Sequence, residues 1–362
     1  MAKYTKLTSI AAAAALLALA GGAQAGGAQT PNTGNTSAAS NWRFAPGQVF
    51  DGVAGALDGV ARLSFTTSAG SYACSGSLLA GGQYVLTAAH CADDFTSMKV
   101  QFGWNNGTAQ VTRSVAVGSA VVHSGWNGDL DTGADIAILK LDQAVTSIKG
   151  YKLSSTLDVG KQHLMAGYGT TQIGSSNSAT NWNDGNYGHY GYNTFDVTSL
   201  DFNTKVFSDD PLYGNADYYK HGVTYMVDFD RSNAAYNVLG RTAAEYGGNW
   251  TSDEGMGANE ALIAGGDSGG GDFVLVNGEW LLSGVHSWGW NDACGYLGYT
   301  SCANANQNGS SYGDLSGSTA VYSHLAFIND VTGVTAVPEP ASYALMALGL
   351  FAVGAVARRR KA

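Results

Sequence analysis

Short apolar runs, each followed by turn-forming residues, are the feature that most constrains the fold of this chain. Between about residues 49 and 333 these runs stay short, and Gly, Asn, Asp and Ser separate them. Examples are VARLSF, QYVLTAA, ADIAILKL, EWLLSGV and TAVYSHLAFI. Such spacing is typical of strands in an antiparallel barrel or sandwich. The clearest helical pattern lies at residues 322–331. We therefore predict an all-β fold with a short C-terminal helix.

The composition supports this fold class and excludes several others. The chain has 362 residues, with 50 Gly and only 13% charged residues, which excludes a coiled coil. The hydrophobic content of 45% excludes global disorder. The glycines follow no Gly-X-Y period, so a collagen is excluded as well. The length suits one large or two medium-sized domains with a sizeable core.

The charge balance excludes a nucleic-acid-binding surface. The net charge of the chain is −10. Six of its 18 basic residues lie in the segments 1–25 and 358–361, which contain no acidic residue. The net charge of the body of the chain, residues 26–357, is therefore more negative than that of the whole chain. A surface that binds phosphates needs a basic stripe, and the body has none.

The first 25 residues have the pattern of a secretory signal peptide. Lys3 and Lys6 precede and border an apolar stretch at 7–20, and Ala23-Gln24-Ala25 forms a small-x-small cleavage site. Export leads to an oxidising compartment, in which disulfides can form. Residues 26–48 are small and polar at their start, which is typical of a flexible linker or a propeptide.

The C-terminal segment 334–362 also has the pattern of a targeting sequence. Val337-Pro338-Glu339-Pro340 precedes a 17-residue apolar run at 341–357, which is followed by RRRKA. The run is just long enough to span a membrane, and the basic cluster would stay on the cytoplasmic side. The three parts resemble the PEP-CTERM sorting tail of Gram-negative bacteria. The resemblance implies transient membrane insertion, removal of the tail by an exosortase, and a final place in the periplasm, on the cell surface or in the extracellular matrix.

Three segments contain residue types suited to covalent catalysis. CSGSLLAGGQYVLTAAHC (74–91) supplies His90, GADIAILKL (133–141) supplies Asp135, and GGDSGGG (265–271) supplies Ser268. A serine hydroxyl becomes a good nucleophile when a neutral histidine takes its proton and a carboxylate orients that histidine. Glycines around the serine let the N–H groups of Gly266 and Ser268 approach an oxyanion. Asp129 and Asp131 could compete with Asp135, but only Asp135 directly precedes an apolar run.

In this order, TAAHC, DIAIL and GDSGG resemble the motifs of the trypsin/chymotrypsin-like serine proteases. The resemblance covers about residues 49–333. It implies that His90 is the general base and acid, that Asp135 orients it and that Ser268 is the nucleophile of an endopeptidase. It also implies an acyl-enzyme intermediate, protein or peptide substrates and no cofactor. The fold implied is two packed six-stranded antiparallel β-barrels, at about 49–150 and 151–333, with the active site between them.

The resemblance extends to two further segments and to one disulfide. AGYGTT (166–171) resembles the strand that opens the second barrel, and AVYSHL (320–325) resembles its last strand. Cys74 and Cys91 match the family disulfide beside the catalytic histidine. We expect Cys294 and Cys302 to pair with each other within one loop, with free thiols as the alternative.

Activation is a point of departure from the family. Family zymogens are cut before an Ile-Val-Gly-Gly-like start, and the new amine pairs with the Asp that precedes the catalytic serine, here Asp267. Val49-Phe50-Asp51-Gly52 lies near that place, without a basic residue directly ahead of it. We therefore expect either a cut before Val49 or Phe50 by another protease, or a different partner for Asp267.

The expected specificity pocket is also unusual. By motif spacing the base of the pocket falls at Leu262 or Ile263. Neither residue is acidic, so cleavage after Arg or Lys is disfavoured. Gly289 and Ala320 would line the walls of the pocket. The segment His286, Ser287, Trp288 and Gly289 resembles the one that pairs with the substrate backbone. Glutamate-specific relatives carry a histidine at the position of His286, which leaves acidic specificity as an alternative to apolar specificity.

The spacing between Asp135 and Ser268 indicates a loop insertion, mostly within 171–257. This insertion is rich in Tyr, Asn and Gly, with a possible hairpin at 223–229, and could form an exosite or simply solvated loops. The acidic pairs Asp129 and Asp131, and Asp228 and Asp230, suit calcium by ligand type, although neither matches a complete binding loop.

Other functional classes are less consistent with the sequence. GDSGG also satisfies the G-x-S-x-G pattern of α/β-hydrolases, but that fold needs Asp and His after the serine and alternating helices and strands. A protease-like surface or matrix binding protein without catalysis is the main alternative; the three intact motif residues argue against it. A structural matrix protein rests only on the tail and the glycine content.

Overall fold

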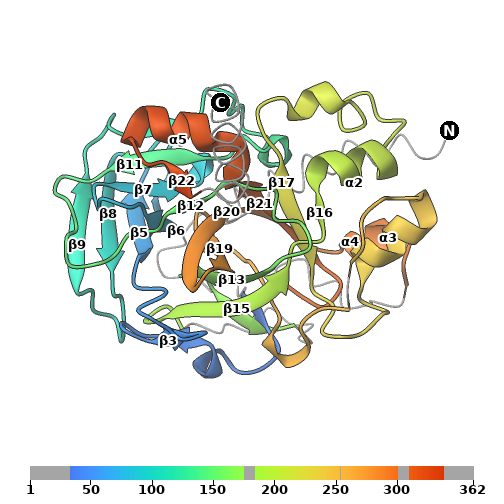
Figure 1. Cartoon of the computed structure of the whole chain (residues 1–362), viewed down its shortest axis with the longest axis horizontal. Coiled ribbons are helices and arrows are strands. Elements are labelled where there is room, and N and C mark those ends of the chain that lie inside the picture. The colour runs from blue at the N-terminus through green and yellow to red at the C-terminus, as the bar shows by residue number, and fades with distance from the viewer. Residues whose placement is uncertain (1–32, 175–183, 253, 301–309, 338–362) are drawn as a thin grey trace, which may run out of the picture.

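The computed structural model describes residues 33–174, 184–252, 254–300 and 310–337. Strands dominate these residues, and helices are short and few (Figure 1). The all-β fold class predicted from the spacing of apolar runs is confirmed. The predicted signal peptide at 1–25, the transmembrane segment at 341–357 and Cys302 lie outside the described residues. Within the described part of the chain, no helix is both long and apolar enough to cross a membrane.

The first half of the chain forms a seven-stranded antiparallel sheet. Its order is β10-β11-β7-β6-β5-β8-β9. Its strands are β5 (Val60–Thr66), β6 (Ser71–Leu78), β7 (Tyr84–Thr87), β8 (Ser97–Phe102), β9 (Val111–Val115), β10 (Val121–Val122) and β11 (Ala137–Lys140). Val115 at the end of β9 bridges to Leu141, directly after β11. This bridge closes the six strands from β11 to β9 into a barrel, because it joins the two ends of that row.

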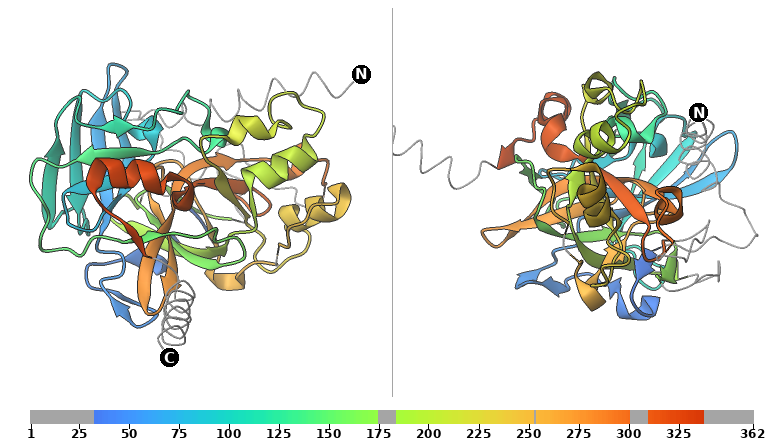
Figure 2. Two further views of the ribbon diagram at one scale, coloured as in Figure 1. Left: turned by 45° about the horizontal axis from the view of Figure 1, so that its top comes forward. Right: turned by 90° about the vertical axis from the view of Figure 1, so that its right-hand side faces the viewer.

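Apolar side chains at alternate positions of the strands fill the interior of this barrel. In β5, Leu63 and Phe65 are buried while the residues between and after them are only partly buried. Helix α5 (Leu325–Thr332) covers part of the same core with Ile328, which is fully buried. The helix ends at Gly333 in a left-handed conformation (φ 72°). The predicted short C-terminal helix is thus confirmed, and Figures 1 and 2 show it beside the first sheet.

The second half forms a larger curled sheet. Its main path is β16-β17-β21-β20-β19-β13-β15-β2; β12 also pairs with β20, and β22 pairs with β12. Its strands are β2 (Arg43–Phe44), β12 (Leu153–Ser154), β13 (Gln162–Gly167), β15 (Gly188–Thr194), β16 (Val197–Thr198), β17 (Thr224–Asp228), β19 (Gly271–Val276), β20 (Glu279–Trp290), β21 (Leu315–Ala320) and β22 (Ala336–Val337). This path has more strands than the six expected for a simple second barrel. The extra strands come from the N-terminal segment and from the insertion.

The insertion contributes helices as well as strands. Helix α2 (Ser199–Val206) begins at Thr198, whose hydroxyl accepts a hydrogen bond from the N–H of Asp201. Helix α3 (Val238–Tyr246) begins in the same way at Asn237. The hairpin predicted at 223–229 is instead one strand, β17, which pairs with β16 and β21. In Figures 1 and 2 both helices lie at the side of the second sheet that is farther from the first sheet.

The segment predicted as linker or propeptide is folded from Thr33 onward. Strand β1 (Thr33–Asn35) lies between β14 (Thr171–Ile173) and β18 (Ala261–Leu262). Arg43 then binds Asp184 through two hydrogen bonds of 2.7 and 2.5 Å. Phe44 is buried, with 5% of its surface exposed. A flexible linker therefore does not extend through residues 33–48, because backbone pairing, an ion pair and an apolar side chain hold them in place.

Candidate active site

His90 and Asp135 meet because two paired strands end side by side. In the antiparallel pair β7–β11, Thr87 lies opposite Ala137. His90 follows β7 in a short 3-10 turn, η2 (Ala89–Cys91), and Asp135 lies two residues before β11. Their side chains meet with His90 Nδ1 2.8 Å from Asp135 Oδ2, and the His90 N–H donates to Asp135 Oδ1 at 3.0 Å. Asp135 is fully buried.

Strands of the second sheet complete the environment of this carboxylate. The Ser287 hydroxyl donates to Asp135 Oδ2 at 2.6 Å, and the Thr319 hydroxyl donates to the Asp135 carbonyl at 3.0 Å. Ser287 can turn this way because the β20–β21 register shifts between His286 and Trp288, which leaves Ser287 as the extra residue of a bulge. Asp135 therefore accepts hydrogen bonds from both halves of the fold.

Ser268 lies at the same junction, although 178 positions separate it from His90 in the sequence. The N–H of Ser75 donates to the Ser268 carbonyl at 2.8 Å. Ser75 adjoins Cys74, and the Cys74–Cys91 disulfide connects that strand to the turn that carries His90. Gly269 packs closely against the end of β7, since a Cβ there would lie 2.0 Å from Thr87 Oγ1. The three motif residues thus converge at one point between the two sheets.

The turn before Ser268 presents backbone N–H groups. Gly266 has φ +95°, which favours glycine. The preceding carbonyl, of Gly265, accepts hydrogen bonds from the N–H and hydroxyl of Thr170 at 3.1 and 3.2 Å. In a planar trans peptide the N–H points opposite to the C=O, so the Gly266 N–H faces away from Thr170. Within the described residues, the N–H groups of Gly266 and Ser268 donate to no protein acceptor.

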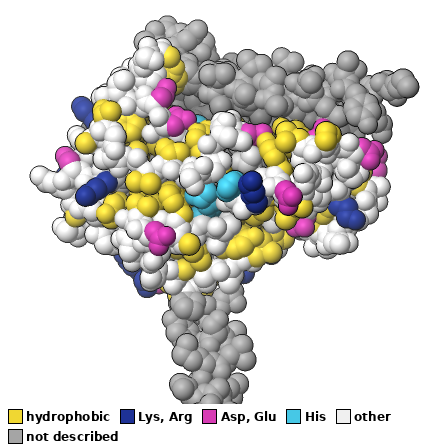
Figure 3. Space-filling model, turned by 90° about the horizontal axis from the view of Figure 1, so that it is seen from above, with side chains coloured by type: hydrophobic (Ala, Val, Ile, Leu, Met, Phe, Trp, Pro, Cys, Tyr) yellow, Lys and Arg dark blue, Asp and Glu magenta, His cyan; other side chains and the backbone are white. Residues whose placement is uncertain are grey.

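His90 has a proton affinity set by two opposing causes. Burial lowers its pKa, but the charge and hydrogen bond of Asp135 raise it, with a further contribution from Asp93, so the pKa lies above the usual value of 6.5. Its side chain remains 16% exposed. The other histidines that are not buried are His123 and His221, and histidine side chains appear near the centre of the face shown in Figure 3. In the described structure no hydrogen bond joins the Ser268 hydroxyl to His90, as is common before substrate binds.

Comparisons with known proteins agree with this geometry. The sequence model of the trypsin family matches residues 52–207. This segment includes His90 and Asp135 but ends before Ser268, which the structure alone places beside them. The model of the PEP-CTERM protein-sorting motif matches residues 336–361 and indicates export and exosortase processing.

Several trypsin-family proteins resemble parts of the chain. Dog chymotrypsin-like elastase family member 1 is 41% identical over 81 residues, which are 21% of this chain and 30% of that protein. Mouse granzyme F is 30% identical over 125 residues, which are 32% of this chain and 49% of that protein. The chain thus spans about a third to a half of the length of these curated relatives. The solved HL collagenase structure is 20% identical, with a TM-score of 0.49, and covers 77% of this chain and 95% of its own.

The residues expected at the base of the trypsin-family specificity pocket are buried. Leu262 and Ile263 are 1% and 5% exposed. Leu262 lies opposite Gly34 of strand β1. Ala320 is also buried and lies opposite Gly284, whereas Ser318, Gly317 and Ser316 lie opposite His286, Trp288 and Gly289. The register therefore places 316–318, rather than Ala320, across from the segment expected to bind substrate.

His286 belongs to a buried polar network. Its Nε2 lies 2.9 Å from Asp272 Oδ1, and its Nδ1 lies 3.2 Å from the carbonyl oxygen of Asp267. Burial lowers its pKa, but Asp272 raises it more, so the pKa lies above the usual value. Burial lowers the pKa of the neighbouring His163 to about 4. With both ring nitrogens of His286 engaged by the protein, neither is left to bind a substrate carboxylate.

Asp267, the residue before the serine, is buried at 3% exposure. Its Oδ1 accepts a hydrogen bond of 2.7 Å from the N–H of Gly169. Val49, the start expected after activation, is 59% exposed and lies in the hairpin of β3 (Val49–Phe50) and β4 (Val53–Ala54). In this structure Val49 is therefore a surface residue. The partner of Asp267 is instead Gly169, which lies two residues after the end of β13.

The acidic pairs considered for calcium are engaged by protein donors. Asp129 accepts from the N–H of Asp131 and from Tyr218, and Asp131 binds Asn203. Burial, followed by the charge of Asp129, raises the pKa of Asp131 to about 8. Within the described ranges, the His/Cys/Asp/Glu group with metal-like spacing is Cys74, His90 and Cys91, whose two sulfurs already form a disulfide.

Sequence reasoning missed three residues that shape the site. The Ser75 hydroxyl donates to the Gly266 carbonyl at 3.0 Å. The Thr319 hydroxyl donates to the Asp135 carbonyl, and the Ser287 hydroxyl donates to Asp135 Oδ2. Ser287 was expected only as a substrate-binding residue. A bulge and two contacts between distant strands produce these roles, and neither leaves a pattern in the linear sequence.

Proposed function

We propose that this chain is a serine endopeptidase that hydrolyses peptide bonds through an acyl-enzyme on Ser268. The observation that carries the proposal is the pairing of His90 with a fully buried Asp135 beside the glycine turn of Ser268. The substrates are proteins or peptides, and the reaction needs no cofactor. The sorting tail supports action outside the inner membrane, in the periplasm, on the cell surface or in the matrix of a Gram-negative bacterium.

The first step forms the acyl-enzyme. Ser268 Oγ attacks the carbonyl carbon of the scissile bond, and its proton passes to His90 Nε2. The Nδ1–H of His90 stays hydrogen-bonded to Asp135, whose negative charge stabilises the imidazolium. Burial of Asp135 strengthens this interaction, because little water screens it.

The oxyanion of the tetrahedral intermediate lies between the N–H groups of Gly266 and Ser268. Neither group has a protein acceptor among the described residues, so both are available. Thr170 and Ser75 hold the two carbonyls of this turn, and the donors are therefore fixed before substrate arrives. In comparable sites one such donor contributes about 2.7–4 kcal/mol to the transition state.

The second half of the reaction releases both products. His90 gives its proton to the leaving amine as the C–N bond breaks. A water molecule then loses a proton to His90 and attacks the acyl carbon, and Ser268 leaves with that proton. The segment Ser287–Gly289 at the exposed end of β20 is suited to pair with the substrate backbone, since Trp288 and Gly289 are only partly buried.

For specificity we propose an apolar side chain before the scissile bond. Leu262 and Ile263 supply no charge for Arg or Lys. An acidic preference through His286 is disfavoured by its two internal partners, Asp272 and the Asp267 carbonyl. A Cβ at Gly289 would meet nothing within 4 Å, so this wall is open.

A fluorophosphonate probe tests the central claim, because it reacts with an activated serine. The exported, processed protein should be labelled, and Ser268→Ala should abolish the labelling. Ser147→Ala, which removes an exposed serine, is the matched control and should label normally. Absence of labelling in the processed protein, or labelling that persists in Ser268→Ala, would refute the proposal and favour a catalytically silent binding protein.

A further inference from the structure

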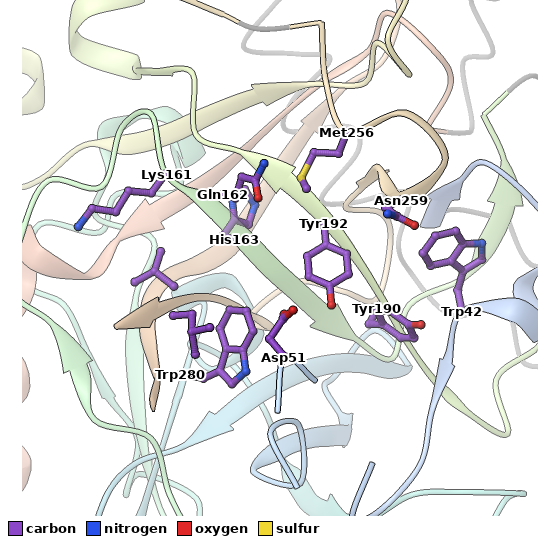
Figure 4. Close-up of a pocket in the computed structure, with 12 residues that line it drawn as sticks. Trp42, Asp51, Lys161, Gln162, His163, Tyr190, Tyr192, Met256, Asn259 and Trp280 are labelled. Carbon is purple, nitrogen blue, oxygen red and sulfur yellow. The ribbon is translucent and has the colours of Figure 1, made fainter. Parts of the chain in front are cut away.

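A pocket of about 760 Å³ lies outside the candidate active site. Strands β13 and β15, the hairpin of β19 and β20, the turn η5 (Gly257–Asn259) and the N-terminal segment form its walls (Figure 4). Its volume is within the range of about 300–1,000 Å³ that is usual for sites of small ligands. None of His90, Asp135 and Ser268 lines it, so its role is separate from the proposed catalysis.

Four aromatic side chains line this pocket: Trp42, Tyr190, Tyr192 and Trp280. The ring centroids of Trp42 and Tyr190 are 5.6 Å apart, and those of Tyr190 and Tyr192 are 6.2 Å apart, both in edge-to-face contact. Such contacts fix the orientation of the rings. The aromatic surface is therefore formed before any ligand arrives, which lowers the entropic cost of binding.

The indole N–H groups of the two tryptophans are engaged by the protein. The indole N–H of Trp42 donates to Ser37 Oγ at 2.8 Å, and that of Trp280 donates to the Phe50 carbonyl at 3.3 Å. Burial, followed by the nearby Asp51, raises the pKa of Tyr192 to about 12. Trp42 and Trp280 are also only 8% and 7% exposed, so the ring surface open to a ligand is mainly that of Tyr190 and Tyr192, which are partly buried.

Polar side chains complete the lining. Gln162 and Asn259 are exposed at the rim, and among the described residues their side-chain amides form no hydrogen bond. Each amide can both donate and accept. Lys161 is already paired with Asp158 at 2.7 Å, so the charge that the lining adds is the carboxylate of Asp51.

We propose that this pocket binds a neutral oligosaccharide. A pyranose ring has faces of C–H groups that pack on aromatic faces, and hydroxyls that each donate and accept, as the two amides do. A proline-rich peptide, which also docks on aromatic grooves, needs donors for its backbone carbonyls. The indole N–H groups that could serve it are already bound to Ser37 and Phe50. The carboxylate of Asp51 disfavours an anionic ligand and can accept hydrogen bonds from sugar hydroxyls.

The test measures binding of neutral glucose oligomers to the full processed protein. Cellohexaose and maltohexaose are titrated at up to millimolar concentrations by calorimetry and by tryptophan fluorescence. We expect saturable binding of at least one of them. The double variant Gln162→Ala/Asn259→Ala should weaken it about tenfold or more through lost hydrogen bonds. Since both residues are exposed, this variant should stay folded, and its thermal unfolding provides the check.

Two controls separate this site from the active site and from the surface in general. Ser268→Ala should bind the oligosaccharide as the parent does, whether or not the proposed protease activity holds. Gln143→Ala, an exposed glutamine elsewhere, should also leave binding unchanged. Failure of both oligomers to bind, binding that the double variant does not weaken, or binding of decaproline in their place would each overturn the proposal.

Discussion

The Ser287 hydroxyl donates to Asp135 Oδ2 at 2.6 Å, the same oxygen that lies 2.8 Å from His90 Nδ1. One residue comes from the second sheet and the other from the first. Closure of the two halves on each other therefore supplies a second donor to this oxygen, beside His90 Nδ1. An unsatisfied carboxylate at that depth would be costly, so this contact couples the folding of the two halves to the assembly of the site.

Ser287→Ala should reduce activity without unfolding the protein. Asp135 loses one donor, which costs about 1–2 kcal/mol and lowers kcat/KM about tenfold. The carboxylate, with less of its charge stabilised, should attract the imidazolium of His90 more strongly, so the pKa of His90 should rise. A pH profile with reporter peptides would then show an acid limb shifted to higher pH. An unchanged profile would mean that Ser287 contributes only packing.

The pH dependence of the parent enzyme follows from the raised pKa of His90. Catalysis requires the neutral imidazole, so kcat/KM should fall as the pH drops through a value above 6.5. The same shift stabilises the folded state below the pKa that His90 has when unfolded, and this contribution is lost as pH rises through the folded-state pKa. Asp135→Asn should move the acid limb to lower pH and reduce kcat by about 10⁴-fold. A limb that does not move would exclude His90 as the titrating group.

The sequence was sufficient to predict the all-β fold class, because apolar spacing is a short-range pattern, whereas the catalytic roles of the three motif residues stay predictions. It was not sufficient for the strand count of the second sheet, since β2 and β17 come from segments with few long apolar runs. Ala320 was expected to line the specificity pocket, but the register pairs it with Gly284, whereas Gly317 and Ser316 lie opposite Trp288 and Gly289. Pairing between distant strands decides such details.

The N-terminus of the active enzyme should lie before Thr33 and not at Val49. A chain that starts at Val49 loses Trp42 and Phe44, which are 8% and 5% exposed, and with them about 3–6 kcal/mol of the free energy of unfolding. Strand β1 pairs in parallel with β14, and a chain that starts at Val49 also loses this pairing. N-terminal sequencing of labelled enzyme decides the point, and a sequence beginning VFDG would contradict it.

The Cys74–Cys91 disulfide should contribute both stability and activity. The two cysteines are 17 positions apart, and closing a loop of that length contributes about 3 kcal/mol in the chain-entropy model. Cys74→Ala/Cys91→Ala should lower the free energy of unfolding by about that amount in urea titrations. The variant should also label more slowly with the fluorophosphonate, since the link between Ser75 and His90 is lost. Equal stability and equal labelling would show that packing alone holds this junction.

The side-chain preference should be apolar because of the partners of His286. Its Nε2 faces Asp272 and its Nδ1 faces a carbonyl, so a substrate glutamate finds no N–H to bind. Matched reporter peptides with Phe, Glu or Lys before the scissile bond should give the highest kcat/KM for Phe. If Glu is preferred, His286 must leave Asp272 when substrate binds, and Asp272→Asn would then change the Glu-to-Phe ratio. If Lys is preferred, the acidic group that binds it must lie outside Leu262 and Ile263, since neither carries a charge.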